Sequence, residues 1–163
     1  MWFFMITCYV MSVLTVVCLG IGFFQSFLHF WIFQANHVTF MILTSIVYAA
    51  TETLVIFFFV GTGVSIKEYT LQHNLDHEFH KRSIAIKRKV YPPLMMNMLY
   101  MVILFVIVGA VDTHRIPGWI YYCLFAFCIW DYIRIKIIQN QCFQENTQIV
   151  LDMSGIEKNV LPQ

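Results

Sequence analysis

Charged side chains are scarce in this sequence, and the first third has almost none. Of the 163 residues only 12% are charged, whereas soluble domains average about 25%. The mean hydropathy is +0.71, and Glu52 is the one acidic or basic residue between Met1 and Ile66. Such a run excludes a soluble globular core. It indicates an integral membrane protein with one domain over residues 1–163.

Other missing patterns narrow the function. The five cysteines form no CxxC pair, and four of them lie in apolar segments where cysteine acts as a small hydrophobe, so a disulfide framework is not expected. The chain has no glycine-rich nucleotide fingerprint, no nucleophile triad and no basic nucleic-acid patch. Its polar segments are also too small for a catalytic domain. We therefore expect neither an enzyme acting alone nor a nucleic-acid partner.

What the chain does have is apolar segments long enough to cross a bilayer, which takes about 20 residues in a helix. They cover residues 5–33, 38–66, 92–111 and 119–138. The links after the first and third segments are short. The sequence therefore predicts an all-α integral membrane fold with four transmembrane helices in two antiparallel hairpins. The first segment lacks the basic start and small-residue cleavage site of a signal peptide, so we expect a retained helix.

The basic residues set the orientation. All Lys and Arg except Arg115 fall in the connection 67–91, in the tail 139–163 or at the end of the fourth segment. By the positive-inside rule this places both termini in the cytoplasm. A bacterial inner (plasma) membrane or an equivalent energy-converting membrane would suit such a chain. We expect the connection to be cytoplasmic and helical, and the tail to be ordered only by a partner.

The basic end of the connection adjoins the third span. It contains Lys87, Arg88 and Lys89, which are candidates for contact with anionic lipid headgroups. Pro92 and Pro93 follow at once, and proline is tolerated in the first turn of a helix. We therefore expect the third transmembrane helix to begin at these prolines.

Glu52 is the main site candidate, because an intramembrane carboxylate costs at least ~2.5–3.5 kcal/mol on insertion scales. Ser45, Tyr48 and Glu52 recur at helical spacing and should face protein. Glu52 is interpreted either as a proton or cation site or as a structural polar contact. We expect no Lys or Arg at its depth, hence no internal salt bridge. Asp131 and Arg134 are spaced as an i,i+3 ion pair.

Two histidine groups are candidate metal sites. On a continuous helix, His73, His77 and His80 would share one face, a spacing that can bind zinc, copper or iron. The alternative is a solvated polar helix. The family of membrane di-iron enzymes is excluded, because it needs several such boxes.

The second group lies on the opposite side of the membrane. It comprises His29, His37, Asp112 and His114. These could hold a metal ion or a haem, or could simply be polar anchors at the interface. No other cofactor is predicted.

The function predicted from these patterns is a non-catalytic accessory subunit of a larger integral-membrane complex, such as a respiratory or other oxidoreductase assembly. Its partners would be other membrane subunits and lipids. Many large aromatic side chains (16 Phe, 8 Tyr, 4 Trp) suit packing on such partners. Two alternatives stay open: a proton- or cation-coupled carrier using Glu52, and a metal- or haem-binding redox subunit using the outer histidines.

Overall fold

The protein is built from long α-helices in a computed structural model that describes residues 2–28, 36–73 and 75–160. The helices are α1 (Trp2–Leu28), α2 (His37–Gln72), α3 (Glu78–Asp112) and α4 (Gly118–Val160). By length and composition, α1, α2 and α3 can each cross a membrane. The chain is therefore all-helical, with the character of a multi-pass membrane protein. In α4, Asp131, Arg134 and Lys136 interrupt the apolar stretch.

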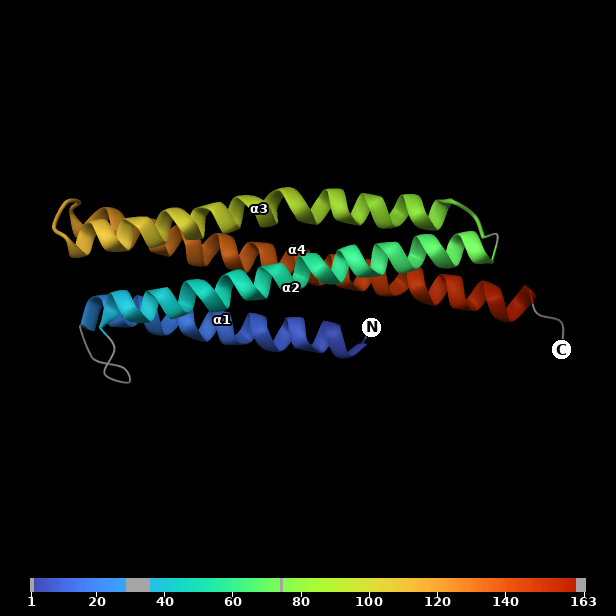
Figure 1. Cartoon of the computed structure of the whole chain (residues 1–163), viewed down its shortest axis with the longest axis horizontal. Coiled ribbons are helices and arrows are strands. Elements are labelled where there is room, and N and C mark those ends of the chain that lie inside the picture. The colour runs from blue at the N-terminus through green and yellow to red at the C-terminus, as the bar shows by residue number, and fades with distance from the viewer. Residues whose placement is uncertain (1, 29–35, 74, 161–163) are drawn as a thin grey trace.

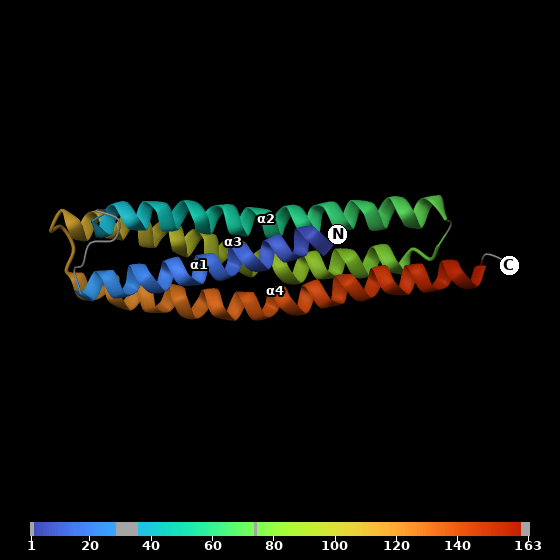
Figure 2. The ribbon, with the colours of Figure 1, turned by 90° about the horizontal axis from the view of Figure 1, so that it is seen from below.

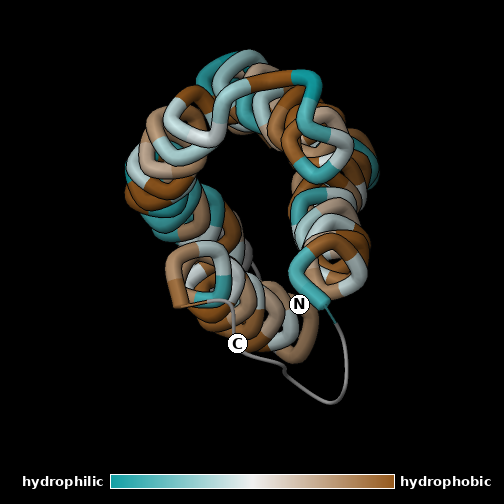
Figure 3. Tube along the Cα trace, turned by 90° about the vertical axis from the view of Figure 1, so that its left-hand side faces the viewer, coloured by the Kyte–Doolittle hydropathy of each residue, from teal (hydrophilic) through white to brown (hydrophobic). Residues whose placement is uncertain are grey.

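The helices lie side by side along one axis and successive helices run in opposite directions (Figures 1 and 2). Each packs on the next, and α1 also contacts α4. Seen end-on, the four surround a common axis (Figure 3). The N-terminus lies partway along the bundle, so α1 covers only part of its length. The first turns of α1 are level with Phe58 and Phe143, where the Phe4 and Tyr9 rings pack.

Beyond that level α2, α3 and α4 continue without α1, and we call this part the three-helix stalk (residues 59–72, 78–90 and 144–160). The 43 residues of α4 make a rod of about 64 Å at ~1.5 Å per residue, roughly twice the ~30 Å hydrocarbon core of a bilayer. The connection expected over 67–91 consequently divides between two helices. α2 runs on to Gln72, a short turn follows, and α3 begins at Glu78.

Pro92 and Pro93 do not open a helix, as the sequence had suggested, but lie inside α3. Each proline removes the N–H that would bond four residues back, at Arg88 and Lys89. Both of those residues are exposed. Their carbonyls can therefore be hydrated, which explains why the helix tolerates the pair at this level.

The tail is ordered by the chain itself, which corrects the expectation that a partner orders it. Residues 139–160 continue α4 and pack on α3. Ile149 and Met153 are buried in the core. On the surface Arg82 Nη1 lies 3.1 Å from Asp152 Oδ2, and Lys89 Nζ lies 2.8 Å from Glu145 Oε1.

Two helix ends have distinctive caps. The Asn36 side chain accepts a hydrogen bond from the Thr39 backbone N–H at 3.1 Å, capping α2 as its position suggests. After α3, His114 N–H donates to the Val111 carbonyl and Arg115 N–H to the Ala110 carbonyl. This is the pairing of a Schellman motif, and His114 occupies its left-handed position with φ 56°.

The buried side chains form two apolar clusters, one at each end of the four-helix part. The outer cluster, near the 113–117 turn, includes Leu19, Met41, Leu104 and Phe125. The other extends into the stalk and includes Cys8, Val55, Phe58, Phe59, Ile86, Leu94, Phe143 and Ile149. Between them the core is polar.

Candidate functional sites

A layer of buried polar side chains separates the two apolar clusters, and all four helices contribute to it. We call it the polar layer: Thr15 from α1, Thr51 and Glu52 from α2, Asn97 from α3, and Asp131, Lys136 and Gln139 from α4. Except for Lys136, whose side chain is 18% exposed, these residues are buried. From His37 to Glu52 is about 22 Å at ~1.5 Å per residue, within the thickness of a hydrocarbon core.

The centre of the polar layer is a closed triangle of three side chains. Lys136 Nζ donates to Glu52 Oε1 at 2.7 Å and to Gln139 Oε1 at 2.8 Å. Gln139 Nε2 donates to Glu52 Oε2 at 2.7 Å. Both carboxylate oxygens of Glu52, which is 0% exposed, therefore have charged or amide donors. The ammonium also lies 4.7 Å from the centroid of the Tyr132 ring, a cation–π contact.

The expectation that Glu52 has no cationic partner is therefore wrong. The prediction placed Glu52 at the midpoint of the second segment and Lys136 at the cytoplasmic end of the fourth, so the two were assigned to different depths. Measured from the outer helix ends, Glu52 and Lys136 lie about 22 and 27 Å deep at ~1.5 Å per residue. A lysine side chain bridges that difference easily. Burying both charges is tolerable because each is paired and hydrogen-bonded.

Two further contacts tie the remaining helices into the polar layer. The hydroxyls of Thr15 and Thr51 are 2.8 Å apart, joining α1 to α2. Asn97 Nδ2 donates to Asp131 Oδ2 at 2.9 Å, joining α3 to α4. The pair predicted between Asp131 and Arg134 is present but long, at 3.9 Å, and Arg134 is exposed. The polar layer thus links α1 to α2, α2 to α4 and α4 to α3.

The polar residues grouped with Glu52 in the sequence have different surroundings. Tyr48 is buried, and its ring packs on Tyr132 at a centroid distance of 5.2 Å. Ser45 is only half-buried, and its hydroxyl donates to the Met41 carbonyl of its own helix. Ser45 therefore contributes no side-chain tie between helices in the polar layer.

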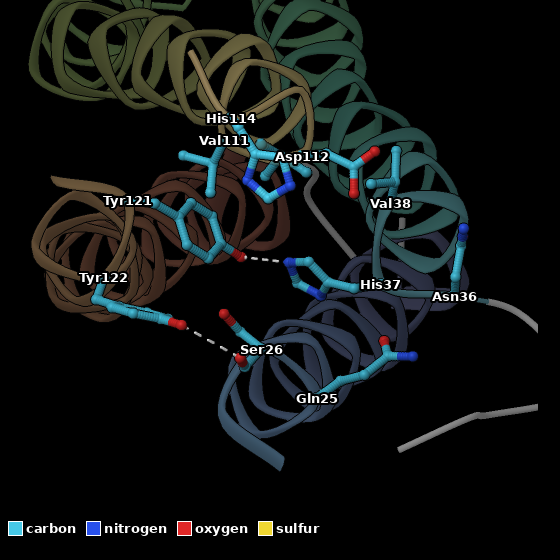
Figure 4. Close-up of a pocket in the computed structure, with 11 residues that line it drawn as sticks. Gln25, Ser26, Asn36, His37, Val38, Val111, Asp112, His114, Tyr121 and Tyr122 are labelled. Atoms are coloured by element: carbon cyan, nitrogen blue, oxygen red, sulfur yellow. Dashed lines mark hydrogen bonds between the residues drawn. The ribbon is translucent and has the colours of Figure 1, made fainter. Parts of the chain in front are cut away.

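A cavity of about 500 Å³ opens at the outer end of the bundle, where all four helices end or begin (Figure 4). We call it the outer cavity. Its lining residues are Gln25, Ser26, Asn36, His37, Val38, Val108, Val111, Asp112, His114, Tyr121 and Tyr122. His37 Nε2 lies 2.8 Å from the Tyr121 hydroxyl, and the Tyr122 hydroxyl donates to the Ser26 carbonyl at 3.4 Å.

Three of the four outer residues proposed as metal ligands, His37, Asp112 and His114, line this one cavity. His29 lies outside the described residues. Over residues 2–28, 36–73 and 75–160, no three His, Cys, Asp or Glu side chains are grouped closely enough to hold a metal ion. The structure thus brings His37, Asp112 and His114 together at one end of the bundle, as predicted. Among the described residues their geometry does not support a metal or haem site.

The second histidine group is divided by a turn, so the shared helix face expected for it is absent. His73 caps the end of α2 and its ring stacks on Tyr69, with centroids 4.1 Å apart. His77 precedes α3, and His80 lies in its first turn. The helical spacing that motivated a metal site therefore does not apply across 73–77.

The three basic residues next to the third span differ in their surroundings. Lys89 pairs with Glu145, and Arg88 is exposed. The Lys87 side chain packs against Gly63, so closely that a Cβ at position 63 would collide with it. Burial there lowers the pKa of Lys87. Contact with lipid headgroups remains a prediction, and Arg88 is the residue of the three whose exposure suits it best.

Comparison with known proteins adds no assignment: no family model, curated protein or solved structure matches the chain.

The residues that sequence reasoning missed are Lys136 and Gln139, which complete the triangle around Glu52. Their i,i+3 spacing continues the inward face of α4 marked by Tyr132. That stripe was available in the sequence, but the fourth span was expected to end at residue 138. Gln139 was therefore assigned to an aqueous tail.

Proposed function

We propose that the protein is a non-catalytic structural subunit of a larger integral-membrane complex. It would cross the membrane four times as two helical hairpins, with α4 as the fourth span. The observation that carries this proposal is the polar layer. Its central charges are paired within the chain, and its contacts fix the register of four helices. Such a layer suits a rigid module better than a carrier, whose ionisable group must exchange protons or cations.

The stalk supplies the docking surface in this proposal. α2, α3 and α4 continue as a compact three-helix body on the side richest in Lys and Arg. Lys81 and Arg88 are exposed on it. With both termini cytoplasmic, in a bacterial inner or equivalent energy-converting membrane, the stalk would project toward cytoplasmic partners such as the peripheral parts of an oxidoreductase assembly.

The direct test is to isolate the tagged full chain from its native membrane in mild detergent. We expect it to migrate with other integral-membrane subunits in a fixed ratio. A Lys81→Glu/Arg88→Glu variant should lose partners while the isolated chain keeps its melting temperature, and Arg115→Glu at the outer turn should lose none. Migration of the native chain as a monomer or homodimer would contradict the proposal.

Orientation is tested separately by cysteine labelling. In a Cys123→Ser background, Thr113→Cys should react with an impermeant reagent from outside, and Lys81→Cys only after the cytoplasmic side is opened. Cys142 should not react with the reagent, because burial raises the pKa of its thiol to about 11. The reverse pattern would invert the topology.

The carrier alternative is distinguished by a variant that removes both charges. In Glu52→Met/Lys136→Met no unpaired charge is left in the core, so a structural subunit should assemble and support the activity of its complex. A carrier using Glu52 should assemble and be inactive at every pH. Arg115→Met, which removes an exposed cation at the outer turn, is the matched control.

A further inference from the structure

The outer cavity has the properties of a ligand site that the structural role of the chain does not use. All four helices contribute to its lining, and its volume of about 500 Å³ falls within the ~300–1,000 Å³ typical of small-molecule pockets. Gln25 lines the cavity yet is only 1% exposed. The rings of His37, His114 and Tyr121 are turned toward one another across it (Figure 4).

We propose that the outer cavity binds a small neutral amphiphile whose ring carries carbonyl or hydroxyl oxygens, the chemistry of a quinone or a phenol. Imidazole and phenol groups can donate hydrogen bonds to such oxygens. His114 and the hydrogen-bonded pair of His37 and Tyr121, 2.8 Å apart, place these groups on one space. Val38, Val108 and Val111 supply apolar lining. A flat ring with oxygens at its edge matches that combination.

The charge of the lining argues against other ligand classes. None of the described lining residues is Lys or Arg, and Asp112 adds a negative charge. Phosphates and other anions would therefore meet repulsion without a cationic partner. Metal ions lack a suitable group of three ligands among the described residues.

The position of the cavity suits a ligand that arrives from lipid. It lies at the outer helix ends, and Trp119 in the first turn of α4 is 66% exposed, as expected for a residue at a membrane interface. The nearby edge between α1 and α4 is bridged by aromatic rings. Phe27 stacks on Tyr122 with centroids 4.6 Å apart, and Phe23 packs on Phe125 at 5.4 Å. An apolar tail can lie along this edge while the ring occupies the cavity.

The backbone at His114 is a second, independent indication. Glycine is the usual residue at the left-handed position of a Schellman motif, because it has no Cβ penalty. Here a histidine occupies it, at φ 56°, and lines the cavity. Unfavourable backbone conformations of this kind cluster at active sites, ligand clamps and switch regions.

The test uses the purified full chain in detergent and a decyl-substituted benzoquinone, with quenching of tryptophan fluorescence as the readout. We expect saturable binding that 1-decanol, inorganic phosphate and Zn²⁺ do not compete away. Tyr121→Phe and His114→Gly should each raise the dissociation constant about threefold to tenfold, the effect of losing one hydrogen bond. Tyr9→Phe, at the other end of α1, should leave it unchanged.

Several results would overturn the proposal. Binding of decanol with equal affinity would show that only the tail is recognised. Non-saturable quenching, competition by phosphate or zinc, or an unchanged constant in both cavity variants would also reject it. Because the measurement needs no partner protein, its outcome is independent of whether the chain is a subunit of a complex.

Discussion

The polar layer and the outer cavity are made of similar side chains but are organised in opposite ways. In the polar layer, Glu52, Lys136 and Gln139 satisfy one another at 2.7–2.8 Å. In the outer cavity His37 and Tyr121 also bond each other, at 2.8 Å, but the polar groups surround a space of about 500 Å³. The difference follows from position along the helices. In the proposed topology, polar groups at the level of the polar layer lie within the hydrocarbon core and must pair within the chain, whereas groups at the outer helix ends can be hydrated and can exchange water for a ligand.

The sharpest way to break this contrast is to open the triangle. Lys136→Met leaves the Glu52 carboxylate buried without its counter-charge, which should destabilise the fold by about 3–5 kcal/mol. Reversible unfolding in mixed micelles would measure it. Arg115→Met at the outer turn is the control, and we expect a change below ~1 kcal/mol because that cation is exposed. Equal effects would mean that the triangle is not specially coupled.

Removing the second charge should recover most of that loss. In Glu52→Met/Lys136→Met neither charge of the pair remains, and only the neutral Gln139 amide loses its partners. Replacing a buried ion pair by residues of similar volume is often neutral or stabilising by about 1–4 kcal/mol. We expect the free energy of unfolding of the double variant to exceed that of Lys136→Met by at least about 2 kcal/mol, because no buried charge is left without its partner. Simple additivity of the two single variants would refute coupling between these residues.

A smaller effect should come from the α1–α2 tie of the polar layer. Thr51→Val keeps the shape of the side chain but removes the hydroxyl that lies 2.8 Å from Thr15. The expected cost is about 0.5–1.5 kcal/mol. Thr53→Val, an exposed position on the same helix, is the matched control. A null result at both positions would show that the Thr15–Thr51 contact adds no measurable stability.

The outer cavity should respond in the opposite direction. His114→Gly relieves the left-handed backbone and should stabilise the protein by up to about 1 kcal/mol. His114→Ala removes the same imidazole but keeps the backbone penalty, so it should bring no gain. A stabilised glycine variant that binds the quinone more weakly would separate stability from ligand recognition. Destabilisation by glycine would mean that the imidazole supports the fold.

The smallest expected effect lies in the stalk, which the proposed topology places outside the membrane. Hydrogen bonds from Gln148 and Arg82 hold the pKa of Asp152 below its usual value of 3.8. A depressed pKa stabilises the fold above the unfolded value and ceases to do so as pH falls through the folded one. The stability advantage of the native protein over Asp152→Asn should therefore be constant from pH 7 to 5 and shrink below pH ~4. An advantage that grew on acidification would contradict this sign.

Much of the architecture is legible in the sequence, because apolar length and the scarcity of charge are strong signals. The helical class and the cap at Asn36 follow from local rules. The ends of the helices do not: the pattern placed them at residues 66, 92 and 138, where polarity changes. The structure continues all three helices past those points, since polar residues form helix equally well when a neighbouring helix buries one face.

The two sites differ in how far they could be predicted. His37, Asp112 and His114 were grouped because short links bring them to one surface, which topology alone can indicate. Lys136 was missed because pairing across the bundle depends on helix tilt and depth, which a single sequence does not specify. The left-handed backbone at His114 could not be predicted from the residue type, since glycine would be expected at such a position.

The pairing of Glu52 with Lys136 also has a consequence in time. The two residues are 84 positions apart, and at a synthesis rate of ~5–20 residues per second the lysine is made about 4–17 s after the glutamate. Until then α2 holds its carboxylate without the partner that later neutralises it. In the proposed topology, the nascent chain therefore passes through a stage in which α1 and α2 must protonate Glu52, hold it at the lipid surface or be shielded by the insertion machinery. Completion of α4 ends that stage.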